Sequence, residues 1–572
     1  MSTWKKLPII PAQEVELKRF EQEISALQHG GNDPEDFKRF CRENGVYGIR
    51  NSTDRHMIRV KIRYGALTAD QLECLADASE EFTPLRIAHI TTRQDLQFHN
   101  VEQRRVPALM RLIAESGLTS REACGNTVRN VTACQFAGIA ADEVFDVTPH
   151  AAAVNEFLLR NPVCQNMPRK FKIAFEGCPA DHARLGINDF GAQAVCRDGR
   201  RGFRISVGGG LGVIPASAQL LEEFTPEEWL LASVEAAIRL FDRHGNRKDR
   251  ARARLKFIIK DWGIDEFRKQ WLAERQIVLS TQSGASVFSL PAVTETAPAL
   301  PTIAPVVAPE TPAYRRWLAT NCVAQKQAGY FAVSIRCLLG DVTVAQMRAV
   351  AGIARRYCGG RVRTTITQNM TLRWIPAQHL PNVHAELTQA VLGAHEAEHL
   401  ADVTRCPGAD TCQLAITHSR GLAEALGELF ANGLAQDPVL QDLTIKISGC
   451  PNSCGQHQIA DLGFTGTSKT IDGHAVAHYR LLLGGRTGNG GATFGVPVVM
   501  LPSKRITSAV TKLLGHYKAT RTATETFHDF VQRVGVPALR QLLEEFTTLP
   551  PHREQPELYG DIGWVGEFSA KG

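Results

Sequence analysis

The feature that most constrains this sequence is an internal repeat, because its two halves resemble one another. Segment 58–99 has a counterpart at 332–374, and both read as an alternating strand, a turn, an amphipathic helix and a second alternating strand. Thr68 and Thr343 stand at matching places just before each predicted helix, where a threonine side chain caps free amide groups. A repeated unit of this length predicts two related halves.

Shorter matches follow in the same order along both halves. They pair CQFA at 134–137 with CQLA at 412–415, KIAFEGCP at 172–179 with KISGCP at 446–451, and RISVGG at 204–209 with RLLLGG at 480–485. INDFG starts nine positions after Cys178, and IADLG starts nine positions after Cys450. Ordered matches at a nearly constant offset indicate a fused tandem duplication. This alignment pairs Cys134 with Cys412 and Cys178 with Cys450.

A proline-rich segment lies between the halves. Residues 291–312 contain six prolines and only two charged residues, which is typical of an extended linker without a core of its own. The segment divides the chain close to its midpoint, so we interpret it as a domain linker.

The composition is that of a soluble globular protein of several domains, with 572 residues, 44% hydrophobic and 22% charged. No apolar run is long enough to cross a membrane, and the N-terminal segment lacks the apolar stretch of a secretory signal. We therefore expect a cytoplasmic protein whose fourteen cysteines are mostly reduced. A net charge of +6 is mild; it does not by itself predict nucleic-acid binding, but it permits an anionic ligand.

Four cysteines of the second half form two close pairs. Cys406 and Cys412 are spaced C-x5-C, and Cys450 and Cys454 are spaced C-x3-C. Thiolates select zinc, copper(I) or iron–sulfur clusters. The spacing favours an iron–sulfur cluster. A four-cysteine zinc site, for which C-x2-C pairs are more usual, and unligated core thiols remain alternatives.

The first half keeps only part of this set. In the alignment above, His182 is aligned with Cys454, and no cysteine is aligned with Cys406. We therefore expect one complete thiolate site in the second half and a degenerate copy in the first. Cys134 and Cys178 have no predicted role.

The first half carries positive charge instead. Arg93 lies in TTRQDLQFH, Arg129 in VRNV, and Lys170 and Lys172 in PRKFKI. On a strand the two lysines point to the same face, because residues two apart do so. Such a cationic face is suited to binding a multiply charged anion, while solvated surface charge is the alternative interpretation.

Two further motifs are interpreted as structural. HEAEH at 395–399 matches the H-E-x-x-H motif of helical zinc proteases. It lies in a polar stretch, so we interpret it as the solvent-exposed end of a helix. The glycine clusters at 207–212 and 484–491 fit neither a dinucleotide motif nor a P-loop. We interpret them as backbone that a large flat ligand can approach closely.

Taken together, these motifs resemble the sulfite and nitrite reductase hemoprotein family, whose members carry siroheme coupled to a [4Fe–4S] cluster. The resemblance spans roughly residues 45–520 and rests on TTRQDLQFH, VRNV, PRKFKI, VGGGLG, the C-x5-C pair and GCPNSCG, in that order. It implies that the cluster ligands are Cys406, Cys412, Cys450 and Cys454. It also implies that Cys454 bridges the cluster to the siroheme iron.

The same resemblance implies which basic residues bind the anionic substrate and the carboxylates of the cofactor. It places four cations around the substrate: Arg93, Arg129, Lys170 and Lys172. Siroheme carries eight carboxylates, so its pocket needs many cations. Further candidates for binding it are Arg363, Lys446, Arg204 and Arg486.

The expected fold class is α+β: a tandem duplication with pseudo-twofold symmetry, in which a small shared ferredoxin-like domain joins two larger α/β lobes of mixed sheets. The expected parts are ferredoxin-like half-domains at 45–114 and 317–395, a siroheme- and substrate-binding lobe at 115–285, a proline-rich linker at 286–316, and an iron–sulfur and siroheme-binding lobe at 396–572.

The resemblance implies six-electron reduction of sulfite to sulfide. The alternatives are reduction of nitrite to ammonia on the same cofactors and, from a different class, a non-catalytic four-cysteine zinc protein. Nitrite-reducing members tend to have asparagine where Lys172 stands, and a dianion gains more from an extra cation than a monoanion does, so sulfite is favoured. The sequence shows no flavin or nicotinamide motif, so we expect an external ferredoxin or flavoprotein reductase as the electron donor. We expect neither a nucleic-acid nor a membrane partner.

Overall fold

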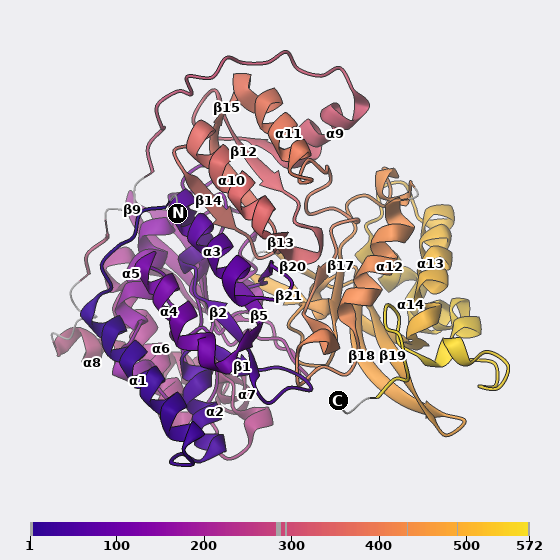
Figure 1. Cartoon of the computed structure of the whole chain (residues 1–572), viewed down its shortest axis with the longest axis horizontal. Coiled ribbons are helices and arrows are strands. Elements are labelled where there is room, and N and C mark those ends of the chain that lie inside the picture. The colour runs from indigo at the N-terminus through magenta and orange to yellow at the C-terminus, as the bar shows by residue number, and fades with distance from the viewer. Residues whose placement is uncertain (1–3, 282–287, 292–294, 432, 489, 570–572) are drawn as a thin grey trace.

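The computed structural model describes residues 4–281, 288–291, 295–431, 433–488 and 490–569. In Figure 1 the first half, indigo to magenta, occupies the left of the view, and the C-terminal lobe, orange to yellow, occupies the right. The remaining part of the second half lies above them, around α10 and α11.

Two five-stranded sheets form the central domain, with strand orders β1-β2-β5-β4-β13 and β11-β12-β15-β14-β3. The first half supplies β1 (Val46–Gly48), β2 (Arg55–Val60), β3 (Ala66–Thr68), α3 (Ala69–Phe82), β4 (Ile87–Ile90), β5 (Leu96–Glu102) and α4 (Val106–Glu115). The second half supplies β11 (Cys322–Ala324), β12 (Tyr330–Ile335), β13 (Asp341–Thr343), α10 (Val344–Tyr357), β14 (Arg361–Thr364), β15 (Met370–Pro376) and α11 (Leu380–Gln389). Helices α3 and α10 contact each other, and one hydrophobic core runs through both units.

Each central sheet takes its last strand from the other half of the chain. β13 pairs antiparallel with β4, which places Asp341 opposite His89. β3 pairs antiparallel with β14, which places Thr68 opposite Arg361. Because each repeat completes the sheet of the other, the two units form one folded domain. The sequence matches did not predict this exchange.

The two predicted helix starts are confirmed as capping boxes. The Thr68 hydroxyl accepts a hydrogen bond from the Gln71 amide at 3.1 Å, and the Gln71 side chain accepts from the Thr68 amide at 3.0 Å. Thr343 and Gln346 form the same pair of bonds at 3.2 and 3.0 Å. Each box satisfies two amide groups that have no partner within the helix.

The second predicted strand of each unit is a hairpin. Between β4 and β5 the Thr91 amide donates to the Asp95 carbonyl at 2.8 Å, and Gln94 adopts a φ of 59°. Gln368 has a φ of 70° in the equivalent turn of the second half. The alternation of apolar residues continues on both sides of the turn, so periodicity alone does not reveal it. The first turn carries Arg93.

Each larger lobe contains one mixed five-stranded sheet, with strand orders β10-β9-β8-β7-β6 and β16-β17-β18-β19-β22. In each lobe the first three strands in sequence pair in parallel and the remaining pairs are antiparallel. The first lobe contains β6 (Thr132–Ala133), α5 (Thr148–Leu158), β7 (Ile173–Glu176), β8 (Phe190–Arg197), β9 (Arg200–Val207), β10 (Gln219–Pro226), α6 (Leu230–His244), α7 (Leu255–Trp262) and α8 (Ile264–Ser280). The second contains β16 (Thr404–Arg405), α12 (Ser419–Ala431), β17 (Ile445–Ser448), β18 (Leu462–Ile471), β19 (His474–Leu483), β20 (Arg486–Gly488), β21 (Gly491–Thr493), β22 (Val496–Pro502), α13 (Ile506–Thr520) and α14 (Phe527–Leu542). The predicted α+β class, with duplicated halves and mixed sheets, is confirmed.

The register of the parallel strands corrects one detail of the sequence alignment. The residue after β6 is Cys134, whose amide donates to the Phe175 carbonyl of β7 at 3.1 Å. The residue after β16 is Cys406, whose amide donates to the Ile447 carbonyl of β17 at 3.1 Å. Cys134 therefore corresponds to Cys406 and not to Cys412. The match between CQFA and CQLA misled the alignment because it is a local similarity outside the strand register.

The proline-rich segment runs over the surface of the second central unit. Its described residues before α9 (Pro312–Asn321) are 288–291 and 295–311, and they contain neither helix nor strand; 286–287 and 292–294 lie outside the described residues. Its contacts with this unit include hydrogen bonds from the Val306 amide to Asn382 Oδ1 at 3.1 Å and from Trp374 Nε1 to Glu295 Oε2 at 3.2 Å. In the N-terminal part of the chain, α1 (Pro11–Gln28) and α2 (Pro34–Glu43) precede the first sheet. Within the described ranges, no helix combines the length and apolar character that crossing a membrane requires.

Candidate active site

A cavity of about 550 Å³ lies where the central domain meets the two lobes. Its wall includes the hairpin turn after β4, the segment leading into β7 and the cysteine loop after β17. The Thr92 hydroxyl donates to the Cys454 carbonyl at 2.9 Å across a sequence separation of 362 residues. The fold thus brings both halves of the chain to one site.

All four cysteines of the second half line this cavity. Cys406 follows β16, and the Gly449 amide donates to its sulfur at 3.2 Å. Cys412 follows a short helical turn, and Cys450 and Cys454 lie in the loop after β17. Such amide–sulfur contacts stabilise thiolates and tune the metal that they bind. The C-x5-C pair and the C-x3-C pair therefore meet at one cavity, as their spacing led us to expect.

The chemistry and spacing of these cysteines suit a metal cluster. Burial, together with the neighbouring thiols, raises the pKa of Cys412 to about 11 and that of Cys450 to about 12, so a cationic centre is needed to hold them as thiolates. Across the described ranges, three or more potential ligand atoms lie within 4.8 Å of one another only at a separate place in the first half. The four cysteines are thus spaced more widely than the ligands of one zinc ion, whose sulfur atoms lie within about 4 Å.

Two of the predicted substrate cations are fixed by backbone carbonyls. The Arg93 guanidinium donates to the Ile173 carbonyl at 3.1 Å and to Asn188 Oδ1 at 2.7 Å. Arg129 donates to the Gly125 carbonyl at 2.9 Å. Burial lowers the pKa of Arg93 to about 10, and its Nε is buried without a partner in the described chain. Both residues line the cavity and supply charge at a fixed place.

The other two, Lys170 and Lys172, present unpaired ammonium groups. Both line the cavity, whereas Phe171 between them is fully buried in the core of the first lobe, as the predicted alternation requires. No hydrogen bond or ion pair joins either Nζ to another described residue. Burial lowers the pKa of Lys170 to about 7 and that of Lys172 well below its ordinary value. A lysine in this state exchanges protons readily near neutral pH, and an anion beside it favours its charged form.

Further cations line the cavity that were not identified from the sequence. They are Arg39, Arg42, Arg59, Arg169, Arg247, Arg250, Arg254 and Arg405. Burial lowers the pKa of Arg169 to about 10, which indicates charge without enough compensation. A sequence signal was available, since segment 247–254 contains four arginines in eight residues. A cavity with this excess of cations requires an anionic occupant, and the eight carboxylates of siroheme meet that requirement.

Four predicted siroheme-binding residues lie elsewhere, and we withdraw them as candidates. Arg363, Lys446, Arg204 and Arg486 are not among the residues that line the cavity. Arg363 and Arg204 form ion pairs with glutamates at 3.1 and 3.2 Å. The Lys446 ammonium donates to Thr404 Oγ1 at 3.1 Å, and Arg486 is exposed on β20. Their positive charges are thus directed to protein groups or solvent.

The HEAEH segment at 395–399 is not helical. Glu396 and Glu398 both have a φ of 68°, and Glu396 is buried with an ion pair to Arg316 at 3.1 Å. The prediction of a solvent-exposed helix end is therefore wrong. Without a helix the two histidines do not share the face that a zinc protease needs, so the protease hypothesis fails as well.

The glycine clusters are explained by packing between backbone segments. A Cβ atom on Gly209 would lie 2.5 Å from the Gly186 carbonyl oxygen, and one on Gly485 would lie 2.5 Å from the Gln458 carbonyl oxygen. The close approach that we expected for a flat ligand is thus made by the chain itself. Within the second cluster, Asn489 lies outside the described residues.

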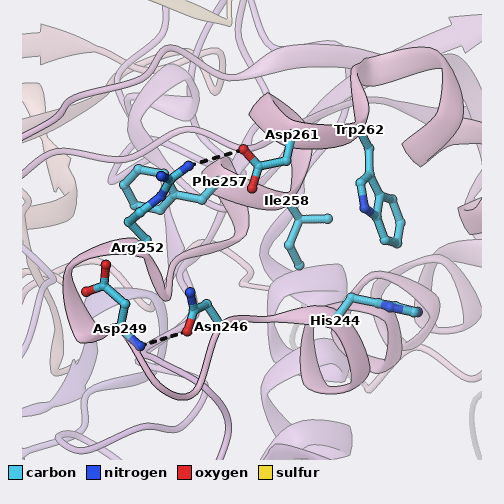
Figure 2. A pocket seen from close by; sticks show the side chains of 8 residues that line it. All are labelled: His244, Asn246, Asp249, Arg252, Phe257, Ile258, Asp261 and Trp262. Atoms are coloured by element: carbon cyan, nitrogen blue, oxygen red, sulfur yellow. Dashed lines mark hydrogen bonds and ion pairs between the residues drawn. The ribbon is translucent and has the colours of Figure 1, made fainter.

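A second pocket, of about 450 Å³, lies beside the end of α6 and α7 (Figure 2). Arg252 lies 3.3 Å from Asp261, and Asn246 Oδ1 accepts from the Asp249 amide at 2.7 Å. Its lining contains no cysteine. It therefore offers no thiolate ligands for a redox centre, and the cysteine-lined cavity is the candidate active site.

Comparison with protein-family models agrees with this architecture. A model described as "Nitrite and sulphite reductase 4Fe-4S domain" matches residues 124–277 and 396–549. A model described as "Nitrite/Sulfite reductase ferredoxin-like half domain" matches residues 47–116 and 323–390. Both models match twice, once in each half.

Individual relatives cover most of the chain. An assimilatory ferredoxin-dependent nitrite reductase of Haloferax mediterranei is 29% identical over 88% of this chain and 86% of the relative. A ferredoxin sulfite reductase of Mycobacterium tuberculosis is 31% identical over 78% of each chain. Among solved structures, the NirA protein of M. tuberculosis matches with a TM-score of 0.76 and 27% identity, over 93% of this chain and 98% of that one.

Proposed function

Because the chain belongs to the nitrite and sulfite reductase family, whose members carry siroheme and a [4Fe–4S] cluster, we propose that it is a sulfite reductase that converts sulfite to sulfide. The reaction consumes six electrons and releases three oxygen atoms as water, so it needs a supply of protons at the substrate. When bound, siroheme and the cluster supply the redox-active iron and the path for single electrons. Cys406, Cys412, Cys450 and Cys454 would hold the cluster.

The observation that carries the choice of sulfite is a pair of lysines whose ammonium groups have no hydrogen-bond or ion-pair partner among the described residues. Lys170 and Lys172 point their ammonium groups into the cavity beside the guanidinium groups of Arg93 and Arg129. The arginines are tethered, so they orient an anion, whereas the lysines are free to donate protons to its oxygens. A dianion gains about twice the Coulomb energy of a monoanion from each cation, which favours sulfite over nitrite.

Nitrite is the second candidate, and a specific observation supports it. The Haloferax relative named as a nitrite reductase is aligned over 88% of this chain, more than the sulfite reductase of M. tuberculosis. The two activities use the same cofactors, so the choice depends on the few side chains around the anion.

We propose a ferredoxin as the electron donor. The relatives above are named as ferredoxin-dependent enzymes. The net charge of +6 suits an acidic donor protein, because complementary charge increases the rate of encounter.

The test is a direct comparison of substrates on the purified holoenzyme, with absorption spectra recorded first to establish that siroheme is present. Reduced ferredoxin supplies the electrons, and kcat/KM is measured for sulfite and for nitrite. We expect a kcat/KM for sulfite at least about tenfold higher, equivalent to about 1.4 kcal/mol of transition-state binding. Equal or faster use of nitrite would contradict the proposal.

A further inference from the structure

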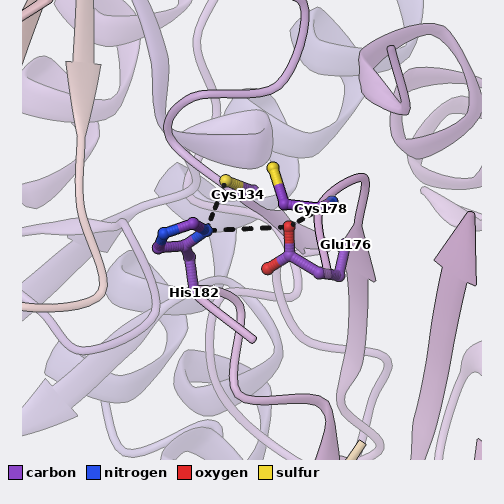
Figure 3. Close-up of side chains that lie close together, drawn as sticks. All are labelled: Cys134, Glu176, Cys178 and His182. Atoms are coloured by element: carbon purple, nitrogen blue, oxygen red, sulfur yellow. Dashed lines mark hydrogen bonds and ion pairs between the residues drawn. The ribbon is translucent and has the colours of Figure 1, made fainter. Parts of the chain in front are cut away.

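Figure 3 shows a group of side chains in the first lobe that could hold a metal ion. It consists of Cys134, Glu176, Cys178 and His182, whose potential ligand atoms all lie within 4.8 Å of one another. Glu176 is fully buried and the two cysteines are 1% exposed, while the His182 side chain is 30% exposed. None of the four is among the residues that line the candidate active site.

The group occupies the place that the cluster ligands occupy in the other half. The strand register equates Cys134 with Cys406, Glu176 with Ser448, Cys178 with Cys450 and His182 with Cys454. One hydrogen bond is repeated as well: Glu176 Oε2 accepts from the amide seven residues later at 2.8 Å, and Ser448 Oγ does the same at 3.1 Å. The fourth cluster cysteine, Cys412, has Ala140 at the equivalent position, six residues after the first ligand. Three of four ligand positions therefore keep a metal-binding side chain.

The carboxylate of Glu176 compensates for the missing fourth cysteine. Its Oε1 accepts from the amides of Gly177 and Cys178 at 2.9 and 3.0 Å, and its Oε2 accepts from Ala183 at 2.8 Å. These bonds fix the carboxylate and fold the loop around it. Oε1 lies 3.9 Å from His182 Nδ1.

The spacing of the group matches one small ion. His182 Nδ1 lies 3.4 Å from Cys134 Sγ. Zinc–sulfur and zinc–nitrogen bonds of about 2.3 and 2.0 Å place neighbouring ligands of a tetrahedral site about 3.5–3.8 Å apart. The Phe136 amide donates to Cys134 Sγ at 3.4 Å, and the Phe136 ring packs edge-on against His182 with centroids 5.5 Å apart, so both ligands are held in place.

We propose that Cys134, Glu176, Cys178 and His182 bind a single zinc ion, in a structural site that derives from the cluster site of the other repeat. Two thiolates, an imidazole nitrogen and a carboxylate are ligands that zinc accepts, and four protein ligands leave no open position for catalysis. The ion would join the loop after β7 to the residue that follows β6. It would replace, in the first half, the crosslink that the iron–sulfur cluster provides in the second.

The test measures metal content on the holoenzyme, purified from cells supplied with iron and zinc. We expect about one zinc per chain by inductively coupled plasma mass spectrometry. X-ray absorption at the zinc edge should show two sulfur ligands at about 2.3 Å and two lighter ligands at about 2.0–2.2 Å. This spectrum requires no variant. Absence of zinc, occupancy by iron, or a disulfide between Cys134 and Cys178 in non-reducing mass spectrometry would each overturn the proposal.

Variants add a matched comparison. His182→Ala removes the most exposed ligand, so it disturbs the core least, and Cys178→Ser removes a buried one. Both should retain less than about a tenth of the zinc, with siroheme absorption and iron content unchanged. Cys164→Ser, at a fully buried cysteine of the same lobe outside the group, should keep its zinc. Loss of zinc from Cys164→Ser, or its retention in both ligand variants, would contradict the site. Because the readout is zinc, the outcome is independent of which anion the enzyme reduces.

Discussion

Within the cavity, arginine and lysine side chains have different tasks. Arg93 and Arg129 donate most of their N–H groups to oxygen atoms of the protein. Their positive charges are therefore held at fixed places in the cavity. Among the described residues, no hydrogen bond or ion pair joins the ammonium group of Lys170 or Lys172 to a partner, and burial lowers their pKa values. This division follows from chemistry, because a guanidinium makes several directed bonds at once, whereas an ammonium on a flexible stem is a mobile point charge that can lose its proton.

The first prediction concerns the size of the lysine effect. Lys172→Ala should lower kcat/KM for sulfite about 10²–10³-fold, the usual effect of removing one donor that stabilises developing charge. Siroheme absorption should stay unchanged, since the cofactor has many other cations. Lys269→Ala, at a 77% exposed lysine, is the control and should match wild type. Unchanged sulfite turnover in Lys172→Ala would remove this residue from the reaction.

The second prediction concerns selectivity. Lys172→Asn keeps a hydrogen-bond donor but removes the positive charge. The dianion sulfite loses about twice as much Coulomb energy as the monoanion nitrite, so the ratio of the two kcat/KM values should move towards nitrite by about tenfold or more. Parallel assays on one preparation of the variant measure this ratio. A ratio equal to that of wild type would mean that charge at this position does not select the substrate.

At the scale of elements, the exchanged strand β13 is joined to the rest of the site by one carboxylate. Asp341 accepts from His89 on β4 at 2.9 Å and from Arg405, next to Cys406, at 2.7 Å. Burial alone would raise its pKa, but Arg405, His89 and Arg420 together hold the pKa well below the ordinary carboxyl value. The strand exchange and the cysteine loop are therefore coupled.

The third prediction tests this coupling. Asp341→Asn should lower the free energy of unfolding at pH 7 by about 3–5 kcal/mol, because it leaves buried cations without their partner. A carboxyl with a depressed pKa stabilises the fold above its unfolded pKa of about 3.9, and this stability is lost as the pH falls through the folded value. The difference between variant and wild type in urea midpoints should thus be full at pH 7 and shrink below pH 4. Asp442→Asn, whose side chain is 74% exposed, should leave the midpoint unchanged at both pH values.

How far the sequence could predict these elements depends on the range of the interactions involved. The helices after Thr68 and Thr343 were predictable because a capping box depends only on two residues three positions apart in the sequence. The hairpin turn that carries Arg93 was missed because alternation continues across it. The equivalence of Cys134 and Cys406 follows from the register of the parallel strands. A four-residue sequence match does not contain that information.

The candidate site follows the same rule. The four cysteines and the four predicted substrate cations each lie in a compact motif, and all of them line the cavity. Arg363 and Lys446 were misplaced because nothing in their own segments shows that Glu295 and Thr404 would bind them. The arginines at 247–254 were overlooked although they lie close together in the sequence.

At the scale of the whole molecule, the two repeats are inseparable in structure although they are separate in sequence. They exchange β3 and β13 and share one hydrophobic core. The connecting segment, in contrast, is exposed near its middle, where Val307 is 94% exposed. Integrity therefore depends on the interface between repeats and not on the covalent link between them.

The fourth prediction follows from this contrast. A protease site introduced beside Val307 should allow complete cleavage, after which both fragments elute together in size-exclusion chromatography with the siroheme absorption intact. Each half expressed alone should aggregate, because it lacks a strand of its own sheet and exposes core surface. A half that folds alone with a native circular dichroism spectrum would contradict the interdependence of the repeats.

The strand exchange also means that β4 is synthesised well before β13, the strand that pairs with it. About 250 residues separate the end of β4 from the end of β13. At about 5–20 residues per second, the ribosome needs roughly 13–50 s to deliver that partner. Throughout this interval the nascent chain carries an open sheet edge to which neighbouring polypeptides can pair. The yield of such a chain in a cell is thus governed by whatever shields that edge during translation, as well as by the stability of the finished fold.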